Sequence, residues 1–215
     1  MKKIAIVLSG AGVYDGAEIH EAVMAMLAVK RNGAEYLMYA PDIPQYHVVN
    51  HLTGEQANEQ RNVLVESARI ARGNIYPLND LNLNEVDALL FPGGFGAAKN
   101  LSTYAYEGSS YSVQPEVEQV IKNAHKQGKV IGAMCISPVL LAKAIPGAAV
   151  TLGGKGDAVD AIEKQGAAHV ETTHGEVTVD KHNKLVTTPC YMLDADITQI
   201  ADGADTLVKA MLALM

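Results

Sequence analysis

Short, unbroken apolar stretches are the feature that most restricts how this chain can fold. Residues 4–8 are apolar at every position, and residues 86–91 and 129–133 are nearly so. A half-exposed strand alternates apolar and polar residues, whereas a strand that is covered on both faces does not. Strands covered on both faces occur mainly in parallel sheets flanked by helices, so these stretches predict an α/β fold.

Helical periodicity fills the intervals between these strands. Residues 17–31, 58–72 and 115–127 repeat apolar residues every three to four positions, and a glycine closely follows each segment. Residues 35–40 are a further predicted strand, so the chain begins strand–helix–strand. With 215 residues, 48% of them hydrophobic, we expect one domain over residues 1–215 with an ample core.

The remaining segments are less regular. Residues 41–54 and 103–114 are expected to be surface excursions, and the second could overhang a functional site. Asp15 is the expected N-cap of the first helix, with Glu18 at the capping-box spacing. Short strands are expected at residues 75–78, 148–152, 169–170, 177–179 and 185–188, and helices at residues 158–165 and 194–215.

Composition excludes several classes of protein. The net charge is -7 and the 17 Lys and Arg residues are scattered, so we expect no nucleic-acid partner. The N-terminal apolar run stops at Ser9, which is too short for a signal peptide or a membrane span, so we expect a cytoplasmic protein without membrane contact. The two cysteines, Cys135 and Cys190, lack the spacing of a zinc site or a disulfide framework, which indicates a reducing compartment and no metal. We expect Cys190 to be a packing residue.

Cys135 is the candidate nucleophile because it lies between a predicted buried strand and a predicted helix that begins near Pro138. A side chain on such a tight turn points outward, and the first amides of the helix have no intrahelical partner. These amides and the helix dipole favour a negative charge, so we expect the thiolate to be stabilised. The competing interpretation is a buried, inert cysteine.

A glycine-rich loop follows the predicted strand at residues 86–91. Gly93 and Gly94 there could direct backbone N–H groups at a neighbouring site and form half of an oxyanion hole, or they could serve only a structural turn. The segment lacks the full phosphate-loop and dinucleotide patterns, so no nucleotide site is assigned.

Six segments in order give the chain a specific resemblance: SGAGVYDGAEIHEA, NHLTGE, RNVLVESARIARG, PGGFGAAKNLS, MCISP and KLVTTPCYML. Together they span residues 9–193 and resemble the ElbB-type (enhancing lycopene biosynthesis) branch of the PfpI/ThiJ, class I glutamine amidotransferase-like superfamily. The resemblance implies a flavodoxin-like three-layer α/β/α sandwich with a mostly parallel central sheet. It also implies weak glyoxalase activity, an association with isoprenoid biosynthesis in bacteria, and a homodimer.

The same resemblance assigns site residues. Cys135 matches the nucleophile, and the oxyanion donors correspond to the backbone amides of Gly93 or Gly94 and of Ile136. The acidic partner of the cysteine lies at the start of the first helix, where Glu18 and Glu21 compete. Both would face the same side of that helix, and Glu18 is preferred.

The chain departs from its superfamily in its histidines. Peptidase-like members carry a histidine directly after the cysteine, where this chain has Ile136, so a proteolytic triad is not expected. The strand after the nucleophile helix carries no histidine either. His20 and His174 are the remaining candidates for a catalytic histidine, against the ordinary interpretation of surface or core residues.

The leading functional hypothesis is a glyoxalase without cofactor that acts on small dicarbonyls such as glyoxal or methylglyoxal. The Cys135 thiolate would add to the aldehyde, Glu18 would move a proton between adjacent carbons, and thioester hydrolysis would release the 2-hydroxy acid. The alternatives are a redox or stress sensor that uses Cys135, a glutaminase-type enzyme, and a protein in which Cys135 is structural.

Overall fold

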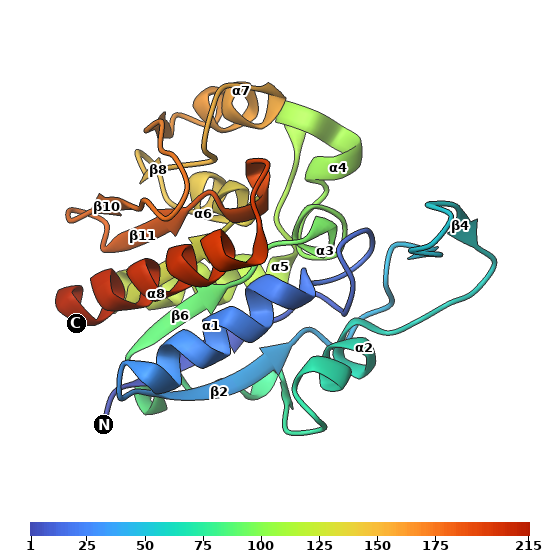
Figure 1. Ribbon diagram of the computed structural model, residues 1–215, viewed down its shortest axis with the longest axis horizontal. Helices are drawn as coiled ribbons and strands as arrows, with labels where there is room; N and C mark the ends of the chain where they lie inside the picture. Colours follow the sequence, from blue (N-terminus) through green and yellow to red (C-terminus); the bar gives the residue numbers. More distant parts are fainter.

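The computed structural model describes residues 1–215, and a seven-stranded sheet lies at its centre (Figure 1). Its strand order is β10-β11-β7-β6-β1-β2-β5, and every neighbouring pair is parallel except β10 with β11. The bounds are β1 Lys3–Val7, β2 Glu35–Ala40, β5 Tyr76–Pro77, β6 Ala88–Phe91, β7 Val130–Met134, β10 Thr178–Asp180 and β11 Leu185–Thr188. Two further two-stranded sheets pair β3 Val48–Val49 with β4 Gln56–Ala57, and β8 Ala149–Val150 with β9 Ala168–His169.

Helices cover both faces of the sheet. The bounds are α1 Ile19–Arg31, α2 Val63–Ile70, α3 Phe95–Lys99, α4 Tyr104–Glu107, α5 Pro115–Lys126, α6 Pro138–Ala144, α7 Asp157–Lys164 and α8 Ile197–Leu214. Helices α1, α2 and α8 pack on one face, and α5, α6 and α7 contribute to the core on the other. The expected three-layer, flavodoxin-like α/β/α sandwich is therefore confirmed. None of the helices is long and apolar enough to cross a membrane.

The unbroken apolar run at the N-terminus is explained by two separate cores. Ala5 and Val7 join a cluster of 29 buried residues on one face of the sheet, while Ile4 and Ile6 join a cluster of 25 on the other. Successive side chains of a strand point to opposite faces, so a strand between two helical layers must be apolar at every position.

Some local predictions are wrong. Glu18, not Asp15, is the N-cap of α1, because its Oε2 accepts the N–H of Glu21 at 2.7 Å. Asp15 instead accepts the N–H of Val49 at 2.7 Å and fastens the β3–β4 segment to the loop after β1. The excursion at residues 103–114 contains helix α4, and Tyr111 within it is fully buried, with its hydroxyl donating to the Val139 carbonyl at 2.7 Å.

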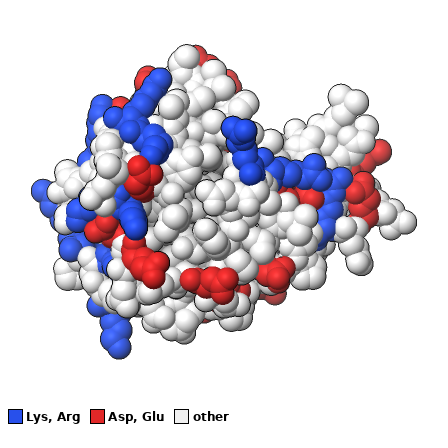
Figure 2. All heavy atoms as spheres, turned by 90° about the horizontal axis from the view of Figure 1, so that it is seen from below, with Lys and Arg blue, Asp and Glu red and all other residues white.

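The segment that carries β3 and β4 extends away from the body of the molecule (Figure 1). On the face shown in Figure 2, acidic and basic side chains are interspersed around a broad area without charged residues. No continuous positively charged area is present on that face.

Candidate active site

The turn between β7 and α6 holds Cys135 in a left-handed backbone conformation, with φ 57°. Non-glycine residues adopt this conformation rarely, and mostly where the surroundings enforce it. Here the N–H of Cys135 donates to the Thr188 carbonyl at 3.0 Å, and the Ser137 hydroxyl donates to the Pro92 carbonyl at 2.7 Å. The turn is thus fixed by the ends of the two neighbouring strands, β11 and β6.

Two backbone N–H groups, those of Gly94 and Ile136, face the Cys135 sulfur closely enough to lower the pKa of its thiol. Gly94 precedes α3 with φ 97°, and a Cβ atom there would lie 2.3 Å from the Glu18 nitrogen, so only glycine fits. A pair of N–H donors beside a nucleophile is the arrangement of an oxyanion hole. Gly94 and Ile136 therefore occupy the positions expected of oxyanion donors.

The N–H of Gly93, which was considered as an oxyanion donor, binds a carboxyl group instead. Its N–H donates to Glu21 Oε2 at 2.8 Å, so this amide holds the carboxyl group and is not free for a substrate oxygen. A Cβ atom at Gly93 would lie 2.3 Å from the Cys135 Cβ and 2.6 Å from Glu21 Oε2. The absence of a side chain is what lets the carboxyl and the sulfur meet.

Glu21, not Glu18, is the acid beside the sulfur, so the preference for Glu18 is wrong. The Glu21 carboxyl is fully buried, hydrogen-bonds the Cys135 thiol, and accepts the N–H of Tyr191 at 3.3 Å. Burial, helped by the nearby Glu18 charge, raises the pKa of Glu21 to about 8, although the N–H groups of Gly93 and Tyr191 oppose this. Glu21 therefore carries a proton at neutral pH.

Burial and the Glu21 charge likewise raise the pKa of the Cys135 thiol well above its usual range, although the N–H groups of Gly94 and Ile136 lower it. The expected preformed thiolate is therefore wrong for the resting site. The helix-end amides are present, but removal of the sulfur from water outweighs them. Two acids in contact titrate as a pair, so the loss of one proton leaves a single negative charge shared between sulfur and carboxyl.

Glu18 lies at the edge of the same site. Besides capping α1, its carboxylate lies 3.9 Å from His20 Nδ1, and it is 8% exposed. His20 is exposed, and its Nδ1 hydrogen-bonds the Tyr191 hydroxyl at 2.8 Å. The structure thus brings His20 to the rim of the site without contact to Cys135. His174 is exposed in the turn before β10 and does not line the pocket.

A pocket of about 600 Å³ opens over Cys135. At the sulfur end it is lined by Glu18, Gly94, Cys135, Ile136, Tyr191 and Met192. The other walls are mostly apolar and aromatic and include Val13, Phe95, Tyr104 and Tyr106, together with Lys99. Cys135 is 7% exposed, so a small molecule can reach the sulfur from this pocket. No histidine lines it, and no group of three or more His, Cys, Asp or Glu side chains is arranged to hold a metal ion.

Tyr191 and Lys99 are pocket residues that the sequence did not indicate. Tyr191 follows Cys190 in a short 3₁₀ turn after β11, and burial together with the Glu18 charge raises its pKa. Nothing in the local sequence links this segment to Glu21, which is 170 positions away. Cys190 is buried in the core, as expected of a packing residue, and burial raises its pKa.

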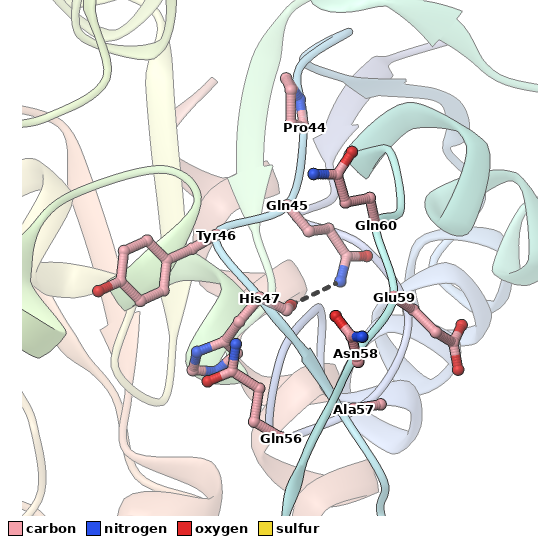
Figure 3. A pocket seen from close by; sticks show the side chains of 9 residues that line it. All are labelled: Pro44, Gln45, Tyr46, His47, Gln56, Ala57, Asn58, Glu59 and Gln60. Atoms are coloured by element: carbon pink, nitrogen blue, oxygen red, sulfur yellow. Dashed lines mark hydrogen bonds between the residues drawn. The ribbon is translucent and has the colours of Figure 1, made fainter.

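A second hollow of about 640 Å³ lies beneath the β3–β4 segment (Figure 3). Its lining is polar, and the Gln45 side chain donates to the His47 carbonyl across it at 3.2 Å. It contains neither Cys135 nor its neighbours, so the chemistry described above belongs to the first pocket.

The protein-family comparison decides the membership of this chain. The model of the DJ-1/PfpI family matches residues 3–192. This chain belongs to the DJ-1/PfpI family. A human member, glutamine amidotransferase-like class 1 domain-containing protein 3, mitochondrial, is 47% identical over 99% of this chain and 83% of its own length. A rat member, ES1 protein homolog, mitochondrial, is also 47% identical, over 99% of this chain and 84% of its own length.

Two solved structures agree with this chain in fold. An isoprenoid biosynthesis protein with an amidotransferase-like domain from Ehrlichia chaffeensis is 33% identical, has a TM-score of 0.92, and matches over 99% of this chain and 100% of its own. Glyoxalase III from Candida albicans has a TM-score of 0.62 over 100% of this chain and 97% of its own, but at 14% identity it shows the shared fold alone.

The names of the relatives overturn one expectation. Both the human and the rat protein are named as mitochondrial, so the cytoplasmic assignment is wrong. That assignment depended on the N-terminal apolar run, which is too short for a secretory signal peptide or a membrane span, and the scarcity of cysteines added only a reducing compartment. Neither feature distinguishes the cytoplasm from another reducing compartment.

Proposed function

We propose that this chain is a glyoxalase without cofactor, which converts glyoxal or methylglyoxal to the corresponding 2-hydroxy acid through a hemithioacetal on Cys135. One observation carries the proposal: the thiol of Cys135, which lines a pocket, lies beside the buried, proton-bearing carboxyl of Glu21 and faces the N–H groups of Gly94 and Ile136. A nucleophile, a proton carrier and an oxyanion hole are the groups that this isomerisation needs.

The reaction begins when the Cys135–Glu21 pair loses one proton. The thiolate adds to the aldehyde carbon, the Gly94 and Ile136 N–H groups stabilise the oxyanion, and Glu21 protonates it. The Glu21 carboxylate then removes the C–H proton of the hemithioacetal, the hydroxyl proton on that carbon passes to the neighbouring oxygen, and Glu21 returns its proton to the adjacent carbon, which leaves a 2-hydroxy thioester. Water hydrolyses the thioester and frees the sulfur, so the net reaction adds one water to one dicarbonyl.

The test is turnover of glyoxal and methylglyoxal by the purified protein, followed by NMR detection of glycolate and lactate. We expect Cys135→Ser to abolish turnover, because the hydroxyl has no base to ionise it. Cys190→Ser is the matched control, since Cys190 does not line the pocket. Wild-type turnover by Cys135→Ser would refute the mechanism.

We further propose that the chain belongs to the ElbB-type branch and is linked to isoprenoid biosynthesis. The similarity to the Ehrlichia protein over nearly the full length supports this placement. A glutaminase is less consistent with the site, because no histidine lines the pocket to protonate departing ammonia. A peroxide sensor would instead give oxidation confined to Cys135 without dicarbonyl turnover, which intact-mass spectrometry after mild peroxide detects.

A further inference from the structure

We propose that the preferred substrates of this pocket are 2-oxoaldehydes with an anionic tail, a carboxylate or a phosphate about four bonds from the carbonyl carbons, and that Lys99 binds the tail. The inference rests on the proposed glyoxalase function and names its substrate class. Glyoxal and methylglyoxal are then truncated substrates.

The size of the pocket is the first observation. Pockets of about 300–1,000 Å³ usually hold ligands much larger than glyoxal, and this one measures about 600 Å³. Glyoxal at the sulfur would leave most of that space to water. The aromatic side chains of Phe95, Tyr104 and Tyr106 lie on the walls beyond the reacting groups. A substrate that contacts them must extend beyond the dicarbonyl unit.

The second observation is a cation on the pocket wall that has no direct ion-pair partner. Lys99 Nζ donates to the Tyr14 carbonyl at 2.7 Å, contacts His47 Nε2 at 3.0 Å and lies 5.0 Å from the centroid of the Phe95 ring, which also lines the pocket. The charge of Asp15 acts on Lys99 without forming an ion pair with it. An ammonium group has three donors, so one stays available for a ligand. Burial lowers the pKa of Lys99, and burial together with the Lys99 charge lowers the pKa of His47. A neutral His47 can accept from the ammonium but cannot neutralise it.

The other charged groups that line the pocket are acidic and lie elsewhere. Glu18 is at the sulfur end, where it caps α1. Asp157, at the start of α7, is close to Tyr104, whose pKa is raised by burial and by the Asp157 charge. Neither acid pairs with Lys99, so anion binding is confined to the Lys99 wall.

Helix α3 sets the length of the tail. Gly94, whose N–H faces the sulfur, precedes α3, and Lys99 is its last residue. At about 1.5 Å per residue, five residues separate the two ends by about 7.5 Å. A tail of four bonds extends about 5 Å, and a hydrogen bond of about 2.9 Å from its carboxylate to the ammonium brings the total close to this distance, which the methyl group of methylglyoxal cannot span.

The decisive measurement compares two substrates of equal shape. One is 4,5-dioxopentanoate, and the other is 5-methyl-2-oxohexanal, in which an isopropyl group replaces the carboxylate. We expect wild-type kcat/KM to favour the anion by about tenfold or more, as for a charge-assisted hydrogen bond. In Lys99→Met the ratio of kcat/KM for the anionic substrate to kcat/KM for the isopropyl analogue should fall close to one. Lys99→Arg should keep most of the preference for the anion. Lys143→Met is the control of equal charge change, because Lys143 binds Gln165 outside the pocket.

A binding experiment separates the two proposals. Calorimetry with 4-oxopentanoate, which lacks the aldehyde, should show binding to wild type that Lys99→Met loses. If this binding is present but no dicarbonyl is turned over, the glyoxalase proposal fails and the anion site stands. If dicarbonyls are turned over with a wild-type ratio near one, the anion site is refuted. A third substrate, 4-phosphooxy-2-oxobutanal, carries a phosphate in place of the carboxylate. Comparison of its kcat/KM with that of 4,5-dioxopentanoate shows which anion the site prefers.

Discussion

At the scale of single residues, the site is governed by two neighbouring acids. Glu21 is fully buried, is held by the N–H groups of Gly93 and Tyr191, and lies beside Cys135, which lines the pocket. Burial keeps both groups protonated, which protects the thiol from reagents in solution. In the proposed reaction, the thiolate loses its negative charge when it bonds to the carbonyl carbon. The Glu21 carboxyl is then free to transfer its proton.

Replacement of Glu21 should affect catalysis far more than replacement of Glu18. Glu21→Gln keeps the hydrogen-bonding shape but cannot accept a carbon-bound proton, so we expect kcat to fall by about 10²–10⁴-fold. Glu18→Gln should mainly weaken the helix cap, at a cost of about 1 kcal/mol or less. Steady-state kinetics on glyoxal and urea denaturation of both variants measure these effects. Equal loss of kcat in the two variants would contradict the assignment of Glu21.

The raised pKa of Glu21 predicts how stability depends on pH. The folded pKa of about 8 lies above the ordinary pKa of 4.5 for a glutamate, so between these pH values the folded state binds more protons than the unfolded state. The contribution of Glu21 to the free energy of unfolding is therefore full below about pH 4.5 and is lost as the pH rises through about 8. Urea denaturation from pH 5 to pH 8.5 should show this decline in wild type. Glu21→Gln should show less of it, and an identical decline in both would contradict the prediction.

At the scale of secondary-structure elements, two glycines after β6 let three elements converge. Gly93 gives space to the Glu21 carboxyl and to Cys135, and Gly94 gives space to the start of α1. The loop between β6 and α3 therefore requires residues without a side chain at positions 93 and 94. A side chain there would push apart the groups that react.

Gly93→Ala should separate the carboxyl from the sulfur. The added Cβ would lie 2.3 Å from the Cys135 Cβ, so we expect a loss of about 1–3 kcal/mol in the free energy of unfolding and a large loss of activity. Gly154→Ala is the control, because no atom lies within 4 Å of its added Cβ. Chemical denaturation and glyoxal turnover of the two variants test this. Full activity of Gly93→Ala would contradict the proposed contact.

The sequence allowed the strands to be predicted more reliably than the site. The apolar stretch at residues 4–8 coincides with β1 to within one residue at each end, because burial on both faces leaves a clear apolar signal. Spacing to Gly33 favoured Glu21, but Glu18 was preferred because it was expected in the first turn. In the structure Glu18 is the N-cap and Glu21 lies in the first turn, and the sequence did not show where that turn begins. Tyr191 and Lys99 were missed because their roles depend on contacts between segments far apart in the chain.

At the scale of the whole molecule, the site lies where the order of the sheet reverses. The chain goes from β1 outward to β2 on one side, and from β6 outward to β7 on the other. Ligands of open α/β sheets bind beyond the carboxyl ends of the strands at such a reversal. The pocket residues that follow β6 and β7 obey this rule.

The outer surface of α1 supports the proposed homodimer. Ile19, Val23 and Leu27 are spaced four residues apart and are 46%, 41% and 38% exposed. Such spacing forms a continuous apolar stripe on a helix. We expect light scattering to give about twice the chain mass of 22.8 kDa, and Val23→Glu to give a monomer. Leu52→Glu, which changes an apolar residue that is 94% exposed on the β3–β4 segment, should leave the mass unchanged. A dimer in Val23→Glu would exclude this stripe as the interface.

The bond from the Tyr191 amide to Glu21 has a consequence for biosynthesis. During translation α1, which carries Glu21, leaves the ribosome long before Tyr191 does. Until Tyr191 has emerged, no N–H group from that part of the chain covers the Glu21 carboxyl. A growing polypeptide consequently lacks the enclosed carboxyl–thiol pair that the proposed reaction requires until the last strands of the sheet have docked.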